Sequence, residues 1–362
     1  MKRTIHVIGA IAISTLSTAW CQTSQKITAG KNTEYGLVYN LPVTALDIYV
    51  EAQLVEETPG EFYNYSRRHL GDATAITEGR REANVKSVTI VPRGVGNADN
   101  RWLAQFKSGT TPYMILDGEG IPLALNTDET AAASVPELPI SKSAAPSPLE
   151  GAAARQAVTQ DMARSSSTGK RAELAAERIF ELREIRSDIL SGQSDNPPAD
   201  GKAMQLVLDN LSAQEAALMA MFTGVRSEST VVEKYTLVPD STEFSGQILA
   251  RLSSVDGLLD KDNLAGAPIK VSLEVVERGE MPVNEKGERK TFPKGGVAYG
   301  IPGKAKITVE YNGNVVASEV VPMAQFGTTF GLDPALFTNK KEPSKVIFDS
   351  TTGAILTLGP AE

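Results

Sequence analysis

The stretch LDIYVEAQLV, residues 46–55, alternates between apolar and polar side chains along its whole length. Its apolar members are Leu46, Ile48, Val50, Ala52 and Leu54. A period of two is typical of a β-strand that buries one face and exposes the other. The stretch therefore predicts a half-buried strand.

Further strand patterns follow this stretch at 85–91, 102–107 and 113–116. The last is joined by the turn sequence DGEG (117–120) to IPLALN, which predicts a hairpin. Between the strands, TPGEFYNYSRRHLG (58–71) predicts a turn and a short helix that ends at Gly71. We therefore expect an N-terminal β domain over 30–127.

The composition changes over residues 128–168, which are rich in Ala, Ser and Pro and contain no aromatic residue. Such a segment buries little apolar surface to offset the loss of chain entropy. It predicts an extended or mobile linker, with helix near 150–163.

Residues 169–224 form a predicted helical unit. The first helix has an apolar stripe and ends at Gly192; the stripe comprises Ala172, Ala175, Ile179, Leu182, Ile185 and Ile189. Asp200 is a candidate N-cap for a second helix. SAQE at 212–215 matches a capping box, so a third helix starts there or the unit is a simple hairpin.

Strand patterns return in a predicted C-terminal β domain over 225–362. PIKVSLEVVE (268–277) alternates, and two alternating runs meet at Asn312-Gly313, a typical type I′ hairpin turn. Another hairpin is predicted about Thr352-Gly353. The fold class is therefore α+β, with two mainly antiparallel, sandwich-like β domains and a helical insertion between them.

The two β regions also invite comparison as an internal duplication. Residues 40–51 and 263–274 share an initial Asn-Leu, apolar residues at matching offsets and a final Glu. Residues 114–125 and 346–358 share an apolar run, an Asp, a glycine turn and a second apolar run. β-Hairpins resemble one another, so the patterns leave chance similarity open.

The first 21 residues have a basic start, an apolar run and small residues near Cys21, which is the pattern of a secretory signal peptide. The apolar run is shorter than a transmembrane helix needs. Cleavage after Ala19 or after Cys21 satisfies the small-x-small rule, and we favour the latter, which leaves Gln22 first. A lipid anchor on Cys21 is the alternative, although Trp20 is bulky for that site.

Removing this leader with Lys2 and Arg3 changes the formal net charge from −8 to −10. An acidic chain without a basic block argues against nucleic acid as a partner. The mature chain would keep one histidine, His69, and no cysteine. Disulfides, thiolate nucleophiles and Cys/His zinc sites are therefore excluded. We expect no cofactor and assign no catalytic or metal-binding residue.

The densest unusual group of side chains lies in residues 60–71 and comprises Tyr63, Tyr65, Arg67, Arg68 and His69. Tyr and Arg are enriched at interaction hot spots, so this group is a candidate partner-binding patch. The alternative is a helix laid across a sheet, with its aromatic residues in the core and its arginines in water.

Catalysis by two carboxylates in a cleft, as in glycoside hydrolases, needs neither His nor Cys. With 44 Asp and Glu residues, the sequence does not single out a pair. Carbohydrate sites usually present aromatic platforms, and only 6% of this chain is aromatic.

Three blocks carry a family resemblance: YNLPVTALDIYVEAQLVEETPGEFYNYSRRHLG, then ELREIRSDILSG with LSAQEAALMAMFTG, then YGIPGKAKITVEYNG with AQFGTTFGL. Together they resemble an uncharacterised family of exported proteins from Gram-negative gut bacteria, whose domain is of unknown function. A lysine often follows the Leu-Pro in that family, where this chain has Val43. The resemblance implies compartment and architecture and defines no catalytic residue.

The sequence thus predicts an exported protein of the periplasm or cell surface that acts as a non-catalytic binding or structural module. Its expected partner is an envelope protein or glycan, and no transmembrane segment is expected after the leader is removed. A carboxylate-based glycoside hydrolase or an accessory polysaccharide-processing protein is the alternative. The sequence leaves the ligand and the oligomeric state open.

Overall fold

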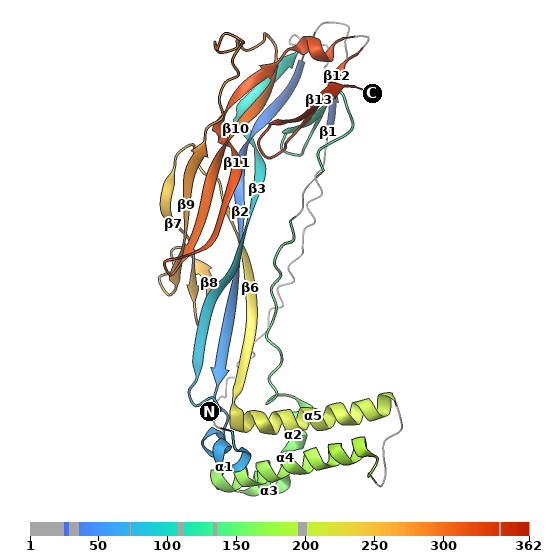
Figure 1. Ribbon diagram of the computed structural model, residues 1–362, viewed down its shortest axis with the longest axis vertical. Helices are drawn as coiled ribbons and strands as arrows, with labels where there is room; N and C mark the ends of the chain where they lie inside the picture. The colour runs from blue at the N-terminus through green and yellow to red at the C-terminus, as the bar shows by residue number, and fades with distance from the viewer. Residues whose placement is uncertain are drawn as a thin grey trace, which may run out of the picture.

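The computed structural model describes residues 25–28, 36–72, 74–106, 112–132, 136–194, 201–339 and 342–361. The predicted leader with Cys21 and the predicted cap Asp200 lie outside these ranges. The fold is α+β as predicted, with 46% strand, 22% helix and the helices in the middle of the chain. The molecule is elongated, with its sheets along the long axis and its helices at one end (Figure 1).

The central sheet has three antiparallel strands in the order β3-β2-β6. They are β2 (Gly36–Thr58), β3 (Arg80–Gln105) and β6 (Val225–Leu237). The alternation at 46–55 is confirmed, since the side chains at 46, 48, 50 and 52 are all fully buried. The strand extends well beyond that stretch, to 23 residues.

β3 is one strand where the sequence suggested two, at 85–91 and 102–107. Its pairing with β2 shifts at two points, and the larger shift is the one between Asn40, which pairs with Arg101, and Pro42, which pairs with Gly96. Leu41 of β2 therefore faces the four residues 97–100 of β3, which has three extra residues at this step. A proline has no N–H for a strand ladder and is found at such irregularities. The register shift accounts for the break in the sequence pattern between the two expected strands.

An outer sheet packs on one face of the central sheet. It has the order β11-β10-β9-β7-β8 and consists of β7 (Phe244–Ser253), β8 (Gly257–Asp260), β9 (Ala267–Glu277), β10 (Val297–Tyr311) and β11 (Asn314–Leu332). Apolar residues of both sheets form the sandwich core. The predicted hairpin turn is confirmed, because Asn312 and Gly313 have φ angles of 50° and 79°.

A third sheet, the end sheet, covers the far end of the molecule from the helices. Its order is β1-β4-β5-β12-β13, with β1 (Gln25–Thr28), β4 (Tyr113–Leu116), β5 (Pro122–Leu125), β12 (Ser344–Phe348) and β13 (Ile355–Pro360). A short 3-10 helix, η2 (Pro334–Phe337), precedes β12. The central and end sheets both combine strands from before and after the helices.

The end core lies between the end sheet and the upper parts of β2, β3 and β10. Leu37, Tyr39 and Leu41 of β2 are each at most 2% exposed in it. The Tyr39 hydroxyl donates a 3.0 Å hydrogen bond to the Ala298 carbonyl of β10, and burial raises the Tyr39 pKa. β2 therefore contributes to both β cores.

One of the two suggested repeat pairs has matching geometry. The β4–β5 and β12–β13 hairpins are neighbours in the end sheet, and their turns are built alike. Asp117 accepts a backbone hydrogen bond from Glu119, and Asp349 accepts one from Thr351. Similar local geometry at the same place in two hairpins supports an internal repeat.

The counterpart of residues 40–51 is β10, so the suggested match with 263–274 is wrong. Tyr39, Leu41 and Pro42 correspond to Tyr299, Ile301 and Pro302, and a register shift lies beside each proline. The amide that follows each tyrosine donates to the glycine carbonyl of a hairpin turn: Asn40 to Gly120 at 2.9 Å, and Gly300 to Gly353 at 2.8 Å. Both glycines have positive φ, which favours glycine.

The helical end contains η1 (Tyr63–Tyr65), α1 (Ser66–Leu70), α2 (Ala152–Ala157), α3 (Gln160–Arg164), α4 (Thr168–Ser191) and α5 (Lys202–Thr223). The predicted stripe of α4 is buried except for Ile185, which is 37% exposed. Glu215 of α5 joins the hairpin by accepting bonds of 2.6 Å from Arg183 and from Arg186 of α4.

A third helix beginning at Ser212 is not formed, because α5 runs unbroken from Lys202 to Thr223. No helix-breaking residue precedes SAQE, so its capping pattern lies inside a continuous helix. The helix predicted near 150–163 is present as α2 and α3. Ala157 and Met162, at 0% and 2% exposure, pack into the helical core.

Residues 127–132 and 136–150 connect the end sheet to the helices and are named the strap here. The strap runs alongside the central sheet as an extended chain (Figure 1). Lys142 forms an isolated antiparallel bridge with Thr230 of β6. The segment predicted as an extended linker is therefore held against β6 at this bridge.

We predict that Leu46→Ala lowers the free energy of unfolding by about 3 kcal/mol, because it leaves a cavity in the sandwich core. Leu264→Ala is the matched control; Leu264 is 81% exposed, so a change within about 0.5 kcal/mol is expected. Denaturant unfolding measures both. Equal effects of the two changes would contradict this core.

Candidate functional site

The predicted patch lies at the helical end, after the last residue of β2. Phe62 is fully buried, and its ring centroid lies 5.4 Å from that of Phe222 in α5. Tyr65 is half-buried against the helical core, and its ring centroid lies 6.3 Å from that of His69. This segment therefore anchors the end of β2 to the helices.

The five patch residues differ in their exposure and contacts. Tyr65 packs toward α4, where its hydroxyl lies close to Gly169, and His69 lies beside it. Tyr63 is half-buried, and Arg67 and Arg68 are exposed. The structure thus brings together one aromatic pair and, separately, two solvent-facing arginines.

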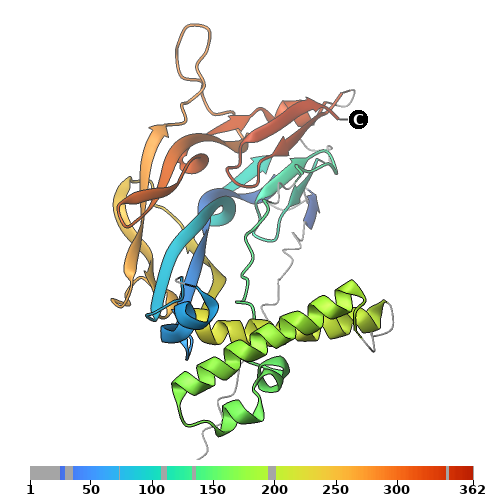
Figure 2. The same ribbon diagram turned by 60° about the horizontal axis from the view of Figure 1, so that its bottom comes forward.

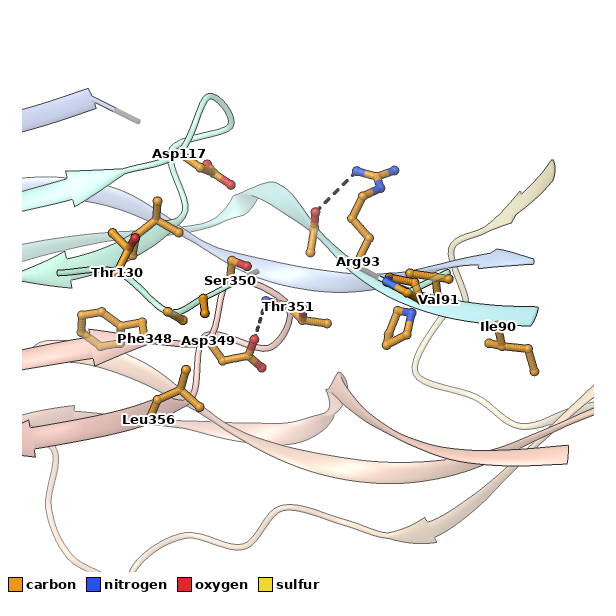
Figure 3. A pocket seen from close by; sticks show the side chains of 16 residues that line it. Ile90, Val91, Arg93, Asp117, Thr130, Phe348, Asp349, Ser350, Thr351 and Leu356 are labelled. Carbon is orange, nitrogen blue, oxygen red and sulfur yellow. Dashed lines mark hydrogen bonds between the residues drawn. The ribbon is translucent and has the colours of Figure 1, made fainter. Parts of the chain in front are cut away.

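A different place is hollowed: the face of the central sheet opposite the sandwich core. A cavity of about 470 Å³, named the upper cavity, lies where β3, the two hairpin turns and the strap meet (Figure 3). Its polar lining includes Arg93 of β3, Asp117 of the β4–β5 turn and Asp349, Ser350 and Thr351 of the β12–β13 turn. Thr130, Ala131, Ala132 and Pro136 of the strap line it as well.

A second cavity of about 400 Å³, named the lower cavity, follows along the same face. Its floor includes Glu51 of β2 and Ser87 and Thr89 of β3, and strap residues 137–140 and 142 form its wall. The two cavities together border β3 from Ser87 to Gly94. They form a groove between the strap and the sheet.

Charged side chains of the groove floor are paired with one another. Asp47 is 5% exposed; its carboxylate lies 3.4 Å from Arg93 Nε and 3.6 Å from Lys234 Nζ, and accepts a 2.7 Å bond from Thr236 Oγ1. Arg93 also lies 3.7 Å from Glu119. Such pairing offsets the cost of burying these charges on the outer face of a sheet.

Glu51 is 9% exposed, on the floor of the lower cavity. Hydrogen bonds from Lys86 Nζ and Ser87 Oγ, at 2.8 and 2.7 Å, lower the pKa of its carboxyl. A general acid needs the opposite shift. Glu51 therefore serves to hold the sheet face together as a stable anion.

The two carboxylates in the upper cavity belong to turns. Asp117 Oδ1 accepts from the amides of Glu119 and Ile121 at 2.8 and 2.9 Å. Asp349 accepts from the Thr351 amide and the Thr352 hydroxyl, and Figure 3 shows it on a separate turn from Asp117. These hydrogen bonds are typical of hairpin turns. The described part of the groove does not place two unpaired carboxylates opposite each other.

Sequence reasoning missed the groove because its lining residues lie far apart in the chain. The turns at 117–120 and 352–353 were recognised as turns, and 128–168 as a linker, without any sign that they meet at β3. One signal was available, since Asp47 and Glu51 alternate with Tyr49 on the polar side of the opening strand. Charged residues on one side of a strand are also typical of a solvent-facing sheet, so this signal alone does not locate the groove.

The family model described as "Domain of unknown function (DUF4831)" matches residues 35–356. The chain belongs to this family. The DUF4831 match includes the central and outer sheets and the helices, which agrees with the expected domain of unknown function. Comparison with curated proteins and with solved structures finds no match. None of the described helices is long and apolar enough to cross a membrane.

We predict that Glu51→Gln lowers the free energy of unfolding by about 1 kcal/mol at pH 7, because charge-assisted hydrogen bonds are lost. The folded pKa of Glu51 is below its ordinary value of 4.5, so this stability is present above that value and is lost as the pH falls through the lowered pKa. The gap between wild type and variant should therefore close in acid.

Denaturant unfolding between pH 7 and pH 3 measures this gap, within the range where the protein stays soluble. Glu285→Gln, at an exposed loop position, is the control and should follow wild type throughout. A gap for Glu51→Gln that does not depend on pH would contradict the assigned hydrogen bonds.

Proposed function

We propose that this protein is an exported, non-catalytic binding module of the cell envelope, and that the groove beside the strap holds a segment of a protein partner. The leader pattern of residues 1–21 supports export. β1 begins at Gln25, so cleavage after Cys21 would leave every described strand intact.

The observation that carries the proposal is the strap itself. It lies along the central sheet as an extended polypeptide, with cavities of about 470 and 400 Å³ between it and the sheet. Ligand sites of proteins are concave and combine apolar walls with a few placed polar groups. Here Leu356 and Pro92 supply apolar wall, and Arg93, Ser350 and Thr130 supply polar groups.

A protein segment fits this groove better than a glycan does. Sugars are commonly held on exposed aromatic rings, and Phe348, the one aromatic residue in the lining of the upper cavity, is fully buried. The lining instead offers small hydroxyl side chains, among them Ser87, Thr89 and Thr351. These groups suit an extended peptide.

The arginines of the predicted patch are proposed as a second contact. Arg67 and Arg68 are exposed at the helical end and make no ion pair with another described residue. The protein is otherwise acidic, with a net charge of −8. Two exposed cations on such a surface favour an acidic part of the partner.

Photo-crosslinking tests the groove directly. A photoreactive amino acid in place of Ser350 is expected to link to one envelope protein, with the adduct mapped to a defined peptide of that protein. The same residue in place of Leu264 is the control and should give no defined adduct. Ser350→Trp, which fills the upper cavity, should abolish binding of the identified peptide, and Leu264→Trp should not.

Adducts at Ser350 that are no more specific than those at Leu264 would contradict the proposal. Turnover of an envelope glycan by the purified protein would contradict its non-catalytic part.

A further inference from the structure

The outer edge of β6 is only partly used. β6 pairs with β2 from Val225 to Leu237 along its inner edge. In an antiparallel ladder, alternate residues turn both their N–H and C=O groups to the same side. At the outer edge, the one isolated bridge within the described chain is that between Thr230 and Lys142 of the strap.

The contact at this edge is short but well formed. The Lys142 amide donates to the Thr230 carbonyl at 2.9 Å, and the Thr230 amide donates to the Lys142 carbonyl at 2.8 Å. The next outward amide of β6, that of Val232, donates to the Ser141 hydroxyl at 2.9 Å. A serine side chain therefore takes the place of the next backbone acceptor, and the ladder ends after one residue pair.

Continuing the ladder in this register would place Ile140 opposite Val232. The strap lifts away instead, and Ile140 remains 76% exposed. Val232 is half-buried beside Glu51 on the groove side of the sheet. The strap thus occupies the edge of β6 without packing Ile140 against Val232.

Two other sheet edges are protected against added strands. On β11, the exposed Glu319 lies opposite the fully buried Ile307, so an added strand would cover a charge. β13 has a register shift against β12 and ends at Pro360. Inward-facing charges, bulges and prolines are common edge protections. On β6, the strap itself occupies the comparable position.

We propose that the outer edge of β6 is a strand-addition site for an extended peptide, and that the strap is its resident, displaceable occupant. The incoming peptide would pair antiparallel with Thr230 and Val232 and place an aliphatic side chain opposite Val232. Main-chain hydrogen bonds would supply affinity, and the side chains of the sheet face beside this edge, Val232 and Glu51, would supply specificity. The proposal rests on the proposed function in one respect only, namely that the peptide belongs to a protein partner of the cell envelope.

Hydrogen exchange at single amides tests the strap contact. The double variant Ser141→Ala, Lys142→Pro removes the hydroxyl acceptor and one backbone donor. We expect the Thr230 and Val232 amides to exchange at least about tenfold faster in it. Val232 loses its hydroxyl acceptor, and loss of the Lys142 N–H breaks the bridge that holds the Lys142 carbonyl against the Thr230 amide. Lys142→Ala keeps the backbone donor and should exchange like wild type. Circular dichroism and thermal unfolding establish that each variant is folded.

A synthetic peptide of residues 137–146 (ELPISKSAAP) is then the probe. It should restore slow exchange at Thr230 and Val232 in the double variant and bind wild type at least about tenfold more weakly, because the resident strap competes. The same peptide with proline at its lysine position is the negative control. A Lys142→Cys, Thr230→Cys disulfide, which suits the spacing of a bonded strand pair, should block the probe until reduced.

Unchanged exchange in the folded double variant, or no protection by the probe, would overturn the proposal. Probe binding that is equally strong in the oxidised and reduced forms of the cysteine variant would overturn it as well. These readouts need no envelope partner, so a failed Ser350 crosslinking experiment with a positive probe result would refute the proposed function alone.

Discussion

The structure depends on the burial of one strand, β2, in both β cores. Leu37, Tyr39 and Leu41 lie in the end core, and the stretch from Leu46 to Ala52 lies in the sandwich core. Four residues after its last residue, Phe62 enters the helical core. β2 also pairs with β3 and β6 along its two edges, so shifting it by one residue would exchange its core-facing and its groove-facing side chains. A second view shows the outer sheet, the end sheet and the helices arranged around β2 and β3 (Figure 2).

Local features of this fold could be predicted from the sequence because they follow from short-range physics. The alternation at 46–55, the turn at Asn312-Gly313 and the apolar stripe of α4 each reflect one element and its period. Long-range relations could not be predicted in this way. Nothing local shows that strands from both sides of the helices share two sheets, or that Pro42 and Pro302 mark register shifts at equivalent places in a repeat. The suggested match of 40–51 with 263–274 failed because alternation is common to all half-buried strands.

The groove could not be predicted for a related reason. Its floor belongs to the opening strand, but its walls come from two turns and a strap that compositional reasoning predicts only as a linker. The low content of His and Cys did limit the classes of catalytic site that the sequence allows. The carboxylates of Asp47, Glu51, Asp117 and Asp349 accept hydrogen bonds that suit structural roles. Within the predicted aromatic and arginine patch, Tyr65 packs against the helical core with His69 beside it, whereas Arg67 and Arg68 are exposed. Chain segments that pass over a sheet, rather than residue motifs, shape the candidate site.

The central claim is that β2 makes the two β cores one cooperative unit. Because β2 has buried residues in both cores, detaching it from one core would also expose buried residues of the other. Native-state hydrogen exchange with increasing denaturant measures this most directly. The account predicts that the slowest amides at Leu37–Leu41 and at Leu46–Ala52 exchange only through global unfolding, with the same free energy and the same denaturant dependence. Exchange of the first group through a separate opening, at clearly lower free energy and with the second group still protected, would contradict it.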